Sequence, residues 1–289
     1  MWTAQAQSCC IPRLPGREQS FTVGRAMTPF VLIPFFLAPF IGSFLGVLIR
    51  RIPRDETFVS GRSYCESCHT HLSAFEMVPI FSYLVQKGRC RHCGASIDPL
   101  HLKVELAALL IPACAVLSRL IGCQLHGVPY DDAVSDLPVF FADCVLGWGL
   151  LVLSWIDLIC LRLPDTITLP LLLTGLLESV VLEGWDGVYD RVMGCAAGWI
   201  LFASVAWGYR RLRKRTGLGG GDVKLLALGG AWVGIAPLPS VVLLSSVLGI
   251  MTAATTIFRT GRFSMTLVVP FGPCLAGAIW IARLTLTAE

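Results

Sequence analysis

Residues 138–156 read PVFFADCVLGWGLLVLSWI, and Asp157 follows them directly. A helix needs roughly 20 mostly apolar residues to cross a hydrocarbon core of about 30 Å, so this stretch is long enough to span a membrane. The rest of the chain has the same character, because 55% of its 289 residues are hydrophobic and only 15% are charged. Soluble domains carry about 25% charged residues. The composition therefore excludes disordered, collagen-like and ordinary soluble proteins and indicates a polytopic membrane protein.

Seven further apolar runs lie on either side of this stretch. Together they predict an all-α polytopic membrane protein with about eight transmembrane helices. The sixth run is short and is bounded by glycines. The predicted spans are 30–49, 104–122, 138–156, 166–182, 192–209, 223–236, 240–258 and 266–284.

Basic residues gather in three of the loops between these runs. Residues 50–103 carry eight arginines and lysines, residues 210–215 read RRLRKR, and Arg259 and Arg262 precede the last span. If all eight runs cross, these loops share one side, and the positive-inside rule places that side in the cytoplasm with both termini outside. The net charge of +4 is small and gives no reason to expect a nucleic-acid partner.

The start of the chain fits neither a span nor a signal peptide. It contains Cys9, Cys10 and several arginines and prolines, and it has no long apolar core. We expect an N-terminal extension here that is disordered, or untranslated if translation starts at Met27. The predicted regions are the extension 1–29, a region 30–122 that holds two spans and the loop 50–103, and a core of six spans over 138–284.

Four of the twelve cysteines form two Cys-x-x-Cys pairs in the first predicted cytoplasmic loop. Cys65 and Cys68 are followed, after 21 residues, by Cys90 and Cys93, and two such pairs can hold one zinc ion tetrahedrally. A reducing cytoplasm disfavours disulfides, and unrelated thiols would not pair twice at this spacing. The sequence therefore predicts a structural zinc ion that folds a loop too small to have its own core. Alternative ligands in the same loop are His69, His71 and His92.

Three aspartates lie near the predicted cytoplasmic ends of the spans. Asp157 ends the third span, Asp165 precedes the fourth, and Asp222 opens the sixth after three glycines. Charged groups at membrane spans are functional candidates, although each of these could instead be a helix cap or a water-facing residue. Three glycines before an acid let backbone and substrate come close, which a cap does not require. We therefore expect these carboxylates to converge on one site.

Two carboxyl groups that share a site can activate a water molecule. Repulsion between them favours a state with one proton, in which the ionised group is the base and the other polarises the scissile carbonyl. A helix N-terminus favours Asp222 as the anion, whereas Asp157 at a helix C-terminus holds its proton more readily. The residues themselves thus indicate a hydrolytic site built on a pair of carboxyl groups.

The chain resembles the bacterial prepilin peptidases, which are membrane aspartic proteases that process type IV prepilins and type II secretion pseudopilins. The resemblance covers nearly everything after residue 38 and includes both cysteine pairs. The other matching segments are 42–53 (GSFLGVLIRRIP), 79–84 (PIFSYL), 104–105 (VE), 156–157 (ID), 163–170 (LPDTITLP) and 219–224 (GGGDVK).

The resemblance implies an activity and roles for particular residues. Members remove a short basic leader after a glycine, and full-length members also methylate the new N-terminus with S-adenosylmethionine. The family's catalytic aspartates correspond to Asp157 and Asp222. Supporting roles are implied for Asp165, Lys224, Gly219, Gly220, Gly221 and Glu105. The resemblance further implies a protein of the bacterial inner membrane whose active site and cysteine loop face the cytoplasm, with prepilin or pseudopilin precursors as partners.

This sequence departs from the family in two places. Gly46 stands where members commonly carry asparagine, and residues 75–78 (FEMV) replace a stretch that usually contains tryptophan and asparagine. Both departures lie in the region linked to methyl transfer, so the resemblance supports proteolysis more strongly than methylation. No glycine-rich strand–helix turn marks a site for the methyl donor.

Three other functions compete with this interpretation. A membrane thiol–disulfide oxidoreductase would need its cysteine pairs on the oxidising face. A proton-coupled transporter would have acids near the midplane and an inverted repeat, and the sequence has neither. A non-enzymatic zinc-loop assembly factor of a pilus or secretion system stays open, with the aspartates as helix caps.

Overall fold

The computed structural model describes residues 28–56, 63–65, 67–127, 136–214, 218–260 and 270–287. Within these ranges all regular structure is helical, apart from two isolated β-bridges in the loop that carries the cysteines. The all-α prediction is therefore confirmed. The expectations about the N-terminal extension and about Met27 fall on residues 1–27, which lie outside the described ranges.

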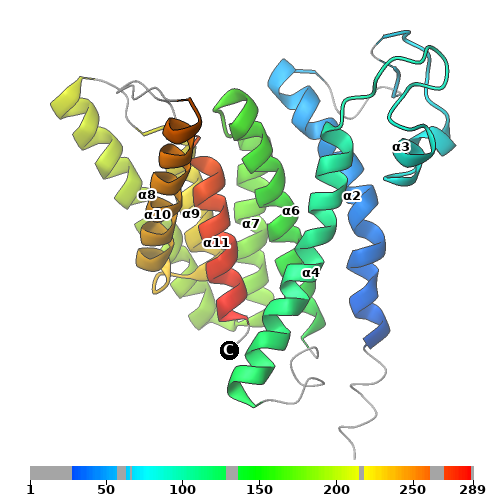
Figure 1. Cartoon of the computed structure of the whole chain (residues 1–289). Coiled ribbons are helices and arrows are strands. Elements are labelled where there is room, and N and C mark those ends of the chain that lie inside the picture. The colour runs from blue at the N-terminus through cyan, green and yellow to red at the C-terminus, as the bar shows by residue number, and fades with distance from the viewer. Residues whose placement is uncertain are drawn as a thin grey trace, which may run out of the picture.

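Each of the eight predicted spans corresponds to a helix (Figure 1). Six of these helices are long and apolar enough to cross a membrane, but α9 has 14 residues and α11 has 15. At 1.5 Å per residue each of these two is only about 21–23 Å long, so the expectation of eight full spans is not confirmed. The helices are α2 (Leu32–Arg51), α4 (Leu100–His126), α6 (Leu137–Cys160), α7 (Asp165–Leu182), α8 (Gly184–Arg213), α9 (Gly220–Val233), α10 (Leu238–Thr260) and α11 (Gly272–Leu286).

The two ends of this bundle differ. The basic residues in the last turns of α2, α8 and α10 all lie at one end (Figure 1). The loop between α2 and α4 sits at the same end and contains the short helices η2 (Ile52–Arg54), η3 (Ala74–Met77) and α3 (Phe81–Val85). We call this the loop end. Because α6 ends there and α9 begins there, the predicted catalytic aspartates also lie at the loop end.

Helix α9 is buried in the bundle because it is apolar around its whole circumference. Every residue from Leu225 to Val233 is buried, and the helix packs against α7, α8, α10 and α11. Glycines on α8 allow the close approach: a Cβ on Gly198 would lie 2.7 Å from the carbonyl oxygen of Leu226. Small residues at such contacts let membrane helices pack backbone to backbone. The position of the α9 N-terminus is thereby fixed by its neighbours.

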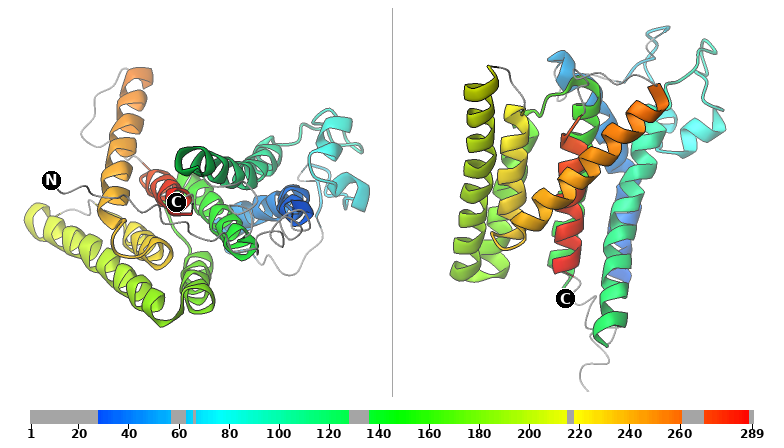
Figure 2. Two further views of the ribbon diagram at one scale, coloured as in Figure 1. Left: turned by 90° about the horizontal axis from the view of Figure 1, so that it is seen from below. Right: turned by 60° about the vertical axis from the view of Figure 1, so that its left-hand side comes forward.

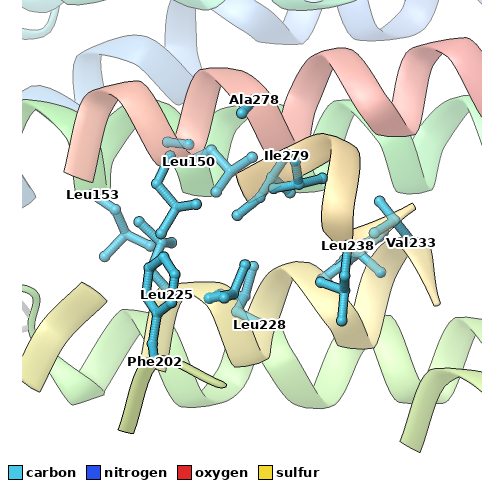
Figure 3. Close-up of a cluster of buried hydrophobic side chains, with 14 of the residues drawn as sticks. Leu150, Leu153, Phe202, Leu225, Leu228, Val233, Leu238, Ala278 and Ile279 are labelled. Atoms are coloured by element: carbon cyan, nitrogen blue, oxygen red, sulfur yellow. The ribbon is translucent and has the colours of Figure 1, made fainter. Parts of the chain in front are cut away.

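Helix α6 connects the two parts of the molecule. One buried cluster joins α6 to the later helices and includes Leu150, Leu225 and Ile279 (Figure 3). A second cluster joins α6 to α2 and α4 and includes Ile49 and Val152. Seen along the bundle, α2 lies on one side of α6, and α8 and α10 lie on the other (Figure 2). The last turn of α6, with Asp157, therefore lies between the two parts.

A network of buried ion pairs closes the end opposite the loop end. Asp143 on α6 is fully buried and accepts hydrogen bonds from Arg119 and Arg283, each at 2.7 Å. Arg283 also pairs with Glu178, and Arg191 pairs with Glu183. Unpaired charges inside such a bundle would be strongly destabilising, so the pairs stabilise the contacts between α4, α6, α7, α8 and α11. The sequence analysis gave none of these residues a role.

Candidate active site

Asp157 lies in the last turns of α6, and its side chain is directed into the bundle. The residue is only 6% exposed, and its Oδ2 accepts a hydrogen bond of 3.0 Å from the backbone N–H of Gly272. Gly272 is the first residue of α11, where backbone N–H groups have no partner within the helix and favour a negative group. The helix α11 thus supplies a partner for a carboxylate that would otherwise be buried without one.

Gly272 is a site residue that the sequence analysis missed. A Cβ at this position would lie 2.5 Å from Oδ2 of Asp157, so a larger residue would displace the carboxylate or the start of α11. The available signal was the motif Pro-Phe-Gly-Pro at 270–273, in which two prolines bracket the start of a helix. The motif does not reveal the hydrogen bond to Asp157, because Asp157 lies 115 residues earlier in the chain.

Asp222 lies in the first turn of α9, beside Asp157. Its backbone N–H donates to the carbonyl oxygen of Gly219 at 3.2 Å, which begins the helix. The charge of Asp157 acts on the carboxyl group of Asp222, so the two groups lie within electrostatic reach of each other. The structure therefore brings together the two aspartates that the sequence analysis selected.

The three glycines before Asp222 are not equivalent. A Cβ on Gly221 would lie 2.9 Å from Cβ of Leu163, so the chain before α7 packs directly against the start of α9. A Cβ on Gly219 would lie 3.2 Å from the carboxylate of Asp222, whereas one on Gly220 would meet open space. The expected close approach of the backbone to a neighbouring segment is thus clear at Gly221, which contacts Leu163. No contact explains the glycine at position 220.

Asp165 and Lys224 form a pair next to the two aspartates. The Nζ of Lys224 donates to Oδ1 of Asp165 at 2.6 Å, and the two side chains are 44% and 53% exposed. Exposed ion pairs contribute about 1 kcal/mol or less to stability. Lys224 is therefore paired with Asp165 rather than with Asp222, and the pair links the first turns of α7 and α9.

Helix ends do not separate the roles of the two catalytic candidates. The sequence analysis placed Asp157 at a helix C-terminus and Asp222 at a helix N-terminus. In the structure Asp157 also faces the N-terminus of α11, so both carboxylates lie at a helix N-terminus. The expectation that Asp222 is the anion for this reason is therefore not supported by the geometry.

Glu105 lies at a different place, where the cysteine loop meets α4. It is 5% exposed, and its Oε2 accepts a hydrogen bond of 2.7 Å from the backbone N–H of Ile80. Ile80 has φ +61°, which is rare for a β-branched residue and indicates a strained turn. Glu105 therefore holds this turn of the loop against the membrane helices and does not join the aspartates.

The four loop cysteines form a cluster that fits a metal ion. Their Sγ atoms all lie within 4.8 Å of one another, and those of Cys65 and Cys93 are 3.9 Å apart. Four thiolates arranged tetrahedrally at about 2.3 Å from a metal would be about 3.8 Å apart. Among the described residues, the cluster includes none of the three loop histidines.

The two cysteine pairs have the same backbone fold. Cys65 N–H donates to Thr70 at 3.0 Å, and Cys90 N–H donates to Ala95 at 2.8 Å. The residue four after each first cysteine has a positive φ, +56° at His69 and +72° at Gly94. Two matching turns thus present two sulfurs each to a common point.

The thiol pKa values differ within the cluster. Hydrogen bonds with the side chain and backbone of Thr70 lower the pKa of Cys68 to about 6. At Cys93 a backbone hydrogen bond with Ala95 lowers the pKa, but desolvation and the other three cysteines raise it to about 11 overall. A cation would remove this conflict, because metal-bound thiols are deprotonated.

The fold and the site together define a polytopic, all-helical membrane protein that has two neighbouring aspartates and a cluster of four cysteines, positioned to hold a metal ion, at one end. Residues 36–118 match the model of the bacterial peptidase A24 N-terminal domain, and residues 144–254 match that of the type IV leader peptidase family. The prepilin leader peptidase/N-methyltransferase of Aeromonas salmonicida (strain A449) is 35% identical over an alignment of length 276 that covers 86% of this chain and 89% of the relative.

Two further relatives carry the same name. The Pseudomonas putida protein is 35% identical over 283 residues, covering 90% of this chain and 92% of the relative. The Pseudomonas aeruginosa protein (strain PAO1) is 32% identical over 278 residues, covering 88% and 90%. The chain therefore belongs to the type IV leader peptidase family. No solved structure matches it.

The cysteine cluster makes a prediction about bound metal. The purified chain is expected to carry about one metal ion, and Cys68→Ser and Cys93→Ser are each expected to lose most of it, because three thiolates bind more weakly than four. Cys114→Ser, at an exposed position on α4, is the matched control and should keep it. Elemental analysis by mass spectrometry measures the metal. Equal metal content in all four proteins would show that the cluster is not the binding site.

Proposed function

We propose that this chain removes the leader from prepilins or pseudopilins at Asp157 and Asp222, and then methylates the new N-terminus. The observation that carries the peptidase assignment is a buried carboxylate, Asp157, which is held by the start of α11 within electrostatic reach of a second carboxylate, Asp222. The names of the relatives support both activities. Asp165 and Lys224 position the start of α9, and with it Asp222.

The reaction needs only water and one shared proton. The ionised carboxylate takes a proton from water, the water oxygen bonds to the scissile carbonyl carbon, and the protonated carboxyl gives its proton to the carbonyl oxygen. When the tetrahedral intermediate collapses, the C–N bond breaks and the departing nitrogen takes the first proton. The new carboxyl group returns the second proton to the pair, which is then ready for another cycle.

The site's place at the loop end suits a substrate with a basic leader and an apolar helix. We place this end in the cytoplasm of a bacterial cell, at the inner membrane, because the basic segments lie there. A leader in water and a helix in the bilayer would put the polar cleavage point at the depth of the aspartates. Acidic residues near that surface would attract the leader's lysines and arginines.

The metal in the cysteine loop is proposed to be zinc. Four thiolates are a common ligand set for structural zinc, and they leave no open position for a reacting group. Zinc would stabilise the fold of residues 63–98, which bury little apolar surface of their own. We propose that region 30–122 supplies the methyl-transfer part and region 138–284 the peptidase core.

The cleavage test uses a prepilin co-expressed with the wild-type chain or with Asp157→Asn or Asp222→Asn. Wild type is expected to remove the leader, and each variant to cleave at least about 10³-fold more slowly, because neither amide can act as the shared acid and base. Asp186→Asn, at an exposed position, is the control. Intact mass spectrometry of the pilin measures cleavage and any added methyl group.

The same experiment separates the peptidase from a zinc-loop assembly factor. An assembly factor would leave the precursor uncleaved by the wild type, and it would tolerate Asn at both positions in a pilus or secretion assay. Wild-type cleavage that persists in either variant would contradict the assigned roles.

A substitution of Gly272 is predicted to slow cleavage, although less than a substitution of either aspartate. Gly272→Ala is expected to slow cleavage by about 10- to 100-fold, because a Cβ would displace the Asp157 carboxylate. Gly277→Ala in the same helix is the control, since a Cβ there would be no closer than 4.0 Å to any neighbour. The rate of leader removal by equal amounts of folded protein measures the effect. Equal rates for the two variants would show that the Gly272 contact does not position Asp157.

A further inference from the structure

Arg283, in the last turn of α11, contacts three other helices of the bundle. Its side chain is buried, and each of its three nitrogens donates to a different helix. Nε donates to Asp143 on α6 at 2.7 Å, Nη1 donates to the carbonyl oxygen of Trp232 on α9 at 3.1 Å, and Nη2 donates to Glu178 on α7. The guanidinium also lies 5.5 Å from the centroid of the Trp232 ring. One side chain thus connects α11 to α6, α7 and α9 at the end opposite the loop end.

The same three helices carry the aspartates of the candidate active site at their other ends. Asp157 lies in the last turns of α6, Asp165 begins α7, and Asp222 lies in the first turn of α9. Helix α11 itself begins with Gly272, whose N–H donates to Asp157. Each helix that supplies one of these carboxylates, or the N–H partner of Asp157, is therefore connected through Arg283.

Apolar contacts between these helices discriminate only weakly between one register and the next. Gly147 on α6 packs against Trp280, and Gly229 on α9 packs against Ile279. Lipid is as apolar as these side chains, so burial alone does little to fix how far one membrane helix lies along another. Hydrogen bonds to a charged group are stronger and have a preferred length and direction. The three bonds of Arg283 therefore favour one register of α11.

Helices α6 and α11 are joined by hydrogen bonds at two points. One is the bond between Gly272 and Asp157, and the other is the bond between Arg283 and Asp143, about four turns earlier on α6 and about three turns later on α11. A helix of this length is nearly rigid, so a shift at Arg283 moves the start of α11 as well. The bond to Asp157 is 3.0 Å long, and an axial shift of about 1 Å would break it.

From these contacts we propose that Arg283 is a positioning residue for the aspartate pair. It fixes the axial position of α11 relative to α6, α7 and α9, and it thereby places the N–H of Gly272 against Asp157 and keeps Asp222 beside it. Arg283 lies about three helical turns from Gly272, so it acts through the backbone of α11. The inference rests on the peptidase part of the proposed function and is independent of the methylation part.

A role in stability alone would be shared by the other buried arginines of this network. Arg191 offers the comparison, because its side chain is 7% exposed and that of Arg283 is 3% exposed. Nε and Nη2 of Arg191 both donate to Glu183, which directly precedes the same helix, α8. A longer contact of 3.8 Å joins Arg191 to Glu178. The two arginines thus resemble each other in burial and differ in the helices that their hydrogen bonds connect.

Arg283→Lys tests the inference in the purified full-length chain with a prepilin as substrate. The change keeps the charge, but one ammonium nitrogen replaces three nitrogens that reach three helices. The maximal single-turnover rate constant for leader removal is expected to fall at least about tenfold, while the half-saturating substrate concentration stays within about threefold. Arg191→Lys is the matched control and should cleave within about twofold of wild type. Equal rate constants for Arg283→Lys and wild type would overturn the inference.

A double-mutant cycle shows whether Arg283 acts through the contact between Gly272 and Asp157. The combination of Arg283→Lys with Gly272→Ala is expected to be within about threefold of the slower single variant, because the same contact is lost only once. Arg191→Lys should leave the rate of Gly272→Ala unchanged within about twofold. A combined loss equal to the product of the two single losses would overturn the inference, since independent destabilisation is additive in free energy.

Hydrogen exchange at the start of α11 gives a readout that does not depend on cleavage. The N–H of Gly272 has no partner within the helix, so its bond to Asp157 protects it from exchange. Pro270 and Pro273 carry no N–H, which leaves few exchanging groups in this segment. Peptides covering 270–273 are expected to exchange at least about tenfold faster in Arg283→Lys and at the wild-type rate in Arg191→Lys. Unchanged exchange in Arg283→Lys would overturn the inference even if cleavage slows.

A second variant decides the matter if Arg283→Lys does not fold. The double change Arg283→Met with Glu178→Gln removes one charge of each sign and leaves Asp143 paired with Arg119. Replacing a buried ion pair by uncharged groups of similar volume is often neutral for stability. The double variant is expected to fold and to cleave at least about tenfold more slowly than wild type. Cleavage at the wild-type rate would overturn the inference.

The outcomes distinguish this inference from the proposed function. A wild type that cleaves, together with an Arg283→Lys variant that cleaves and exchanges as the wild type does, would overturn the inference and leave the peptidase assignment intact. A folded wild type that leaves the prepilin uncleaved would overturn the peptidase assignment and the inference together.

Discussion

The hydrogen bond from Gly272 to Asp157 is the contact on which the site depends. A carboxylate buried among membrane helices is costly unless it has a partner, and the start of α11 provides one. Helix α11 packs in turn against α6, α9 and α10, so the bond also sets where these helices meet. Asp222 reaches the same point because α9 is enclosed by its neighbours. The pair thus results from the packing of the whole bundle.

The two ends of the bundle have complementary roles. At the end opposite the loop end, buried ion pairs centred on Asp143 and Arg283 connect five helices and stabilise the frame. At the loop end the chain carries the aspartates and the cysteine cluster. Helix α6 takes part in both ends and both hydrophobic clusters. Helix α6 therefore connects the end that holds the buried ion pairs with the loop end, which holds the candidate active site.

The positions of the helices and of the cysteine cluster could be predicted from the sequence, because apolar runs and cysteine spacing are local signals. The eight helices lie where hydropathy placed them, and the four cysteines converge as their spacing indicated. The lengths of α9 and α11 were less predictable, since burial in protein rather than in lipid permits short helices. The ion pairs of Asp143 were missed because hydropathy averages a single charge into an apolar run.

Contacts between distant parts of the chain could not be predicted from the sequence. No local pattern shows that Gly272 meets Asp157, or that Lys224 pairs with Asp165 instead of Asp222. The electrostatic setting of Asp157 was out of reach for the same reason, because it depends on the α11 N-terminus as well as on the end of α6.

The most direct measurement of the central claim is the rate constant for single-turnover cleavage of a prepilin by wild type, Asp157→Asn, Asp222→Asn and the double variant. If the two carboxyl groups act as one unit, each single change lowers the rate at least about 10³-fold, and the double variant is within about threefold of the slower single variant. A double variant that loses the product of the two single effects would show that the aspartates act independently. That result would contradict a shared, water-activating pair.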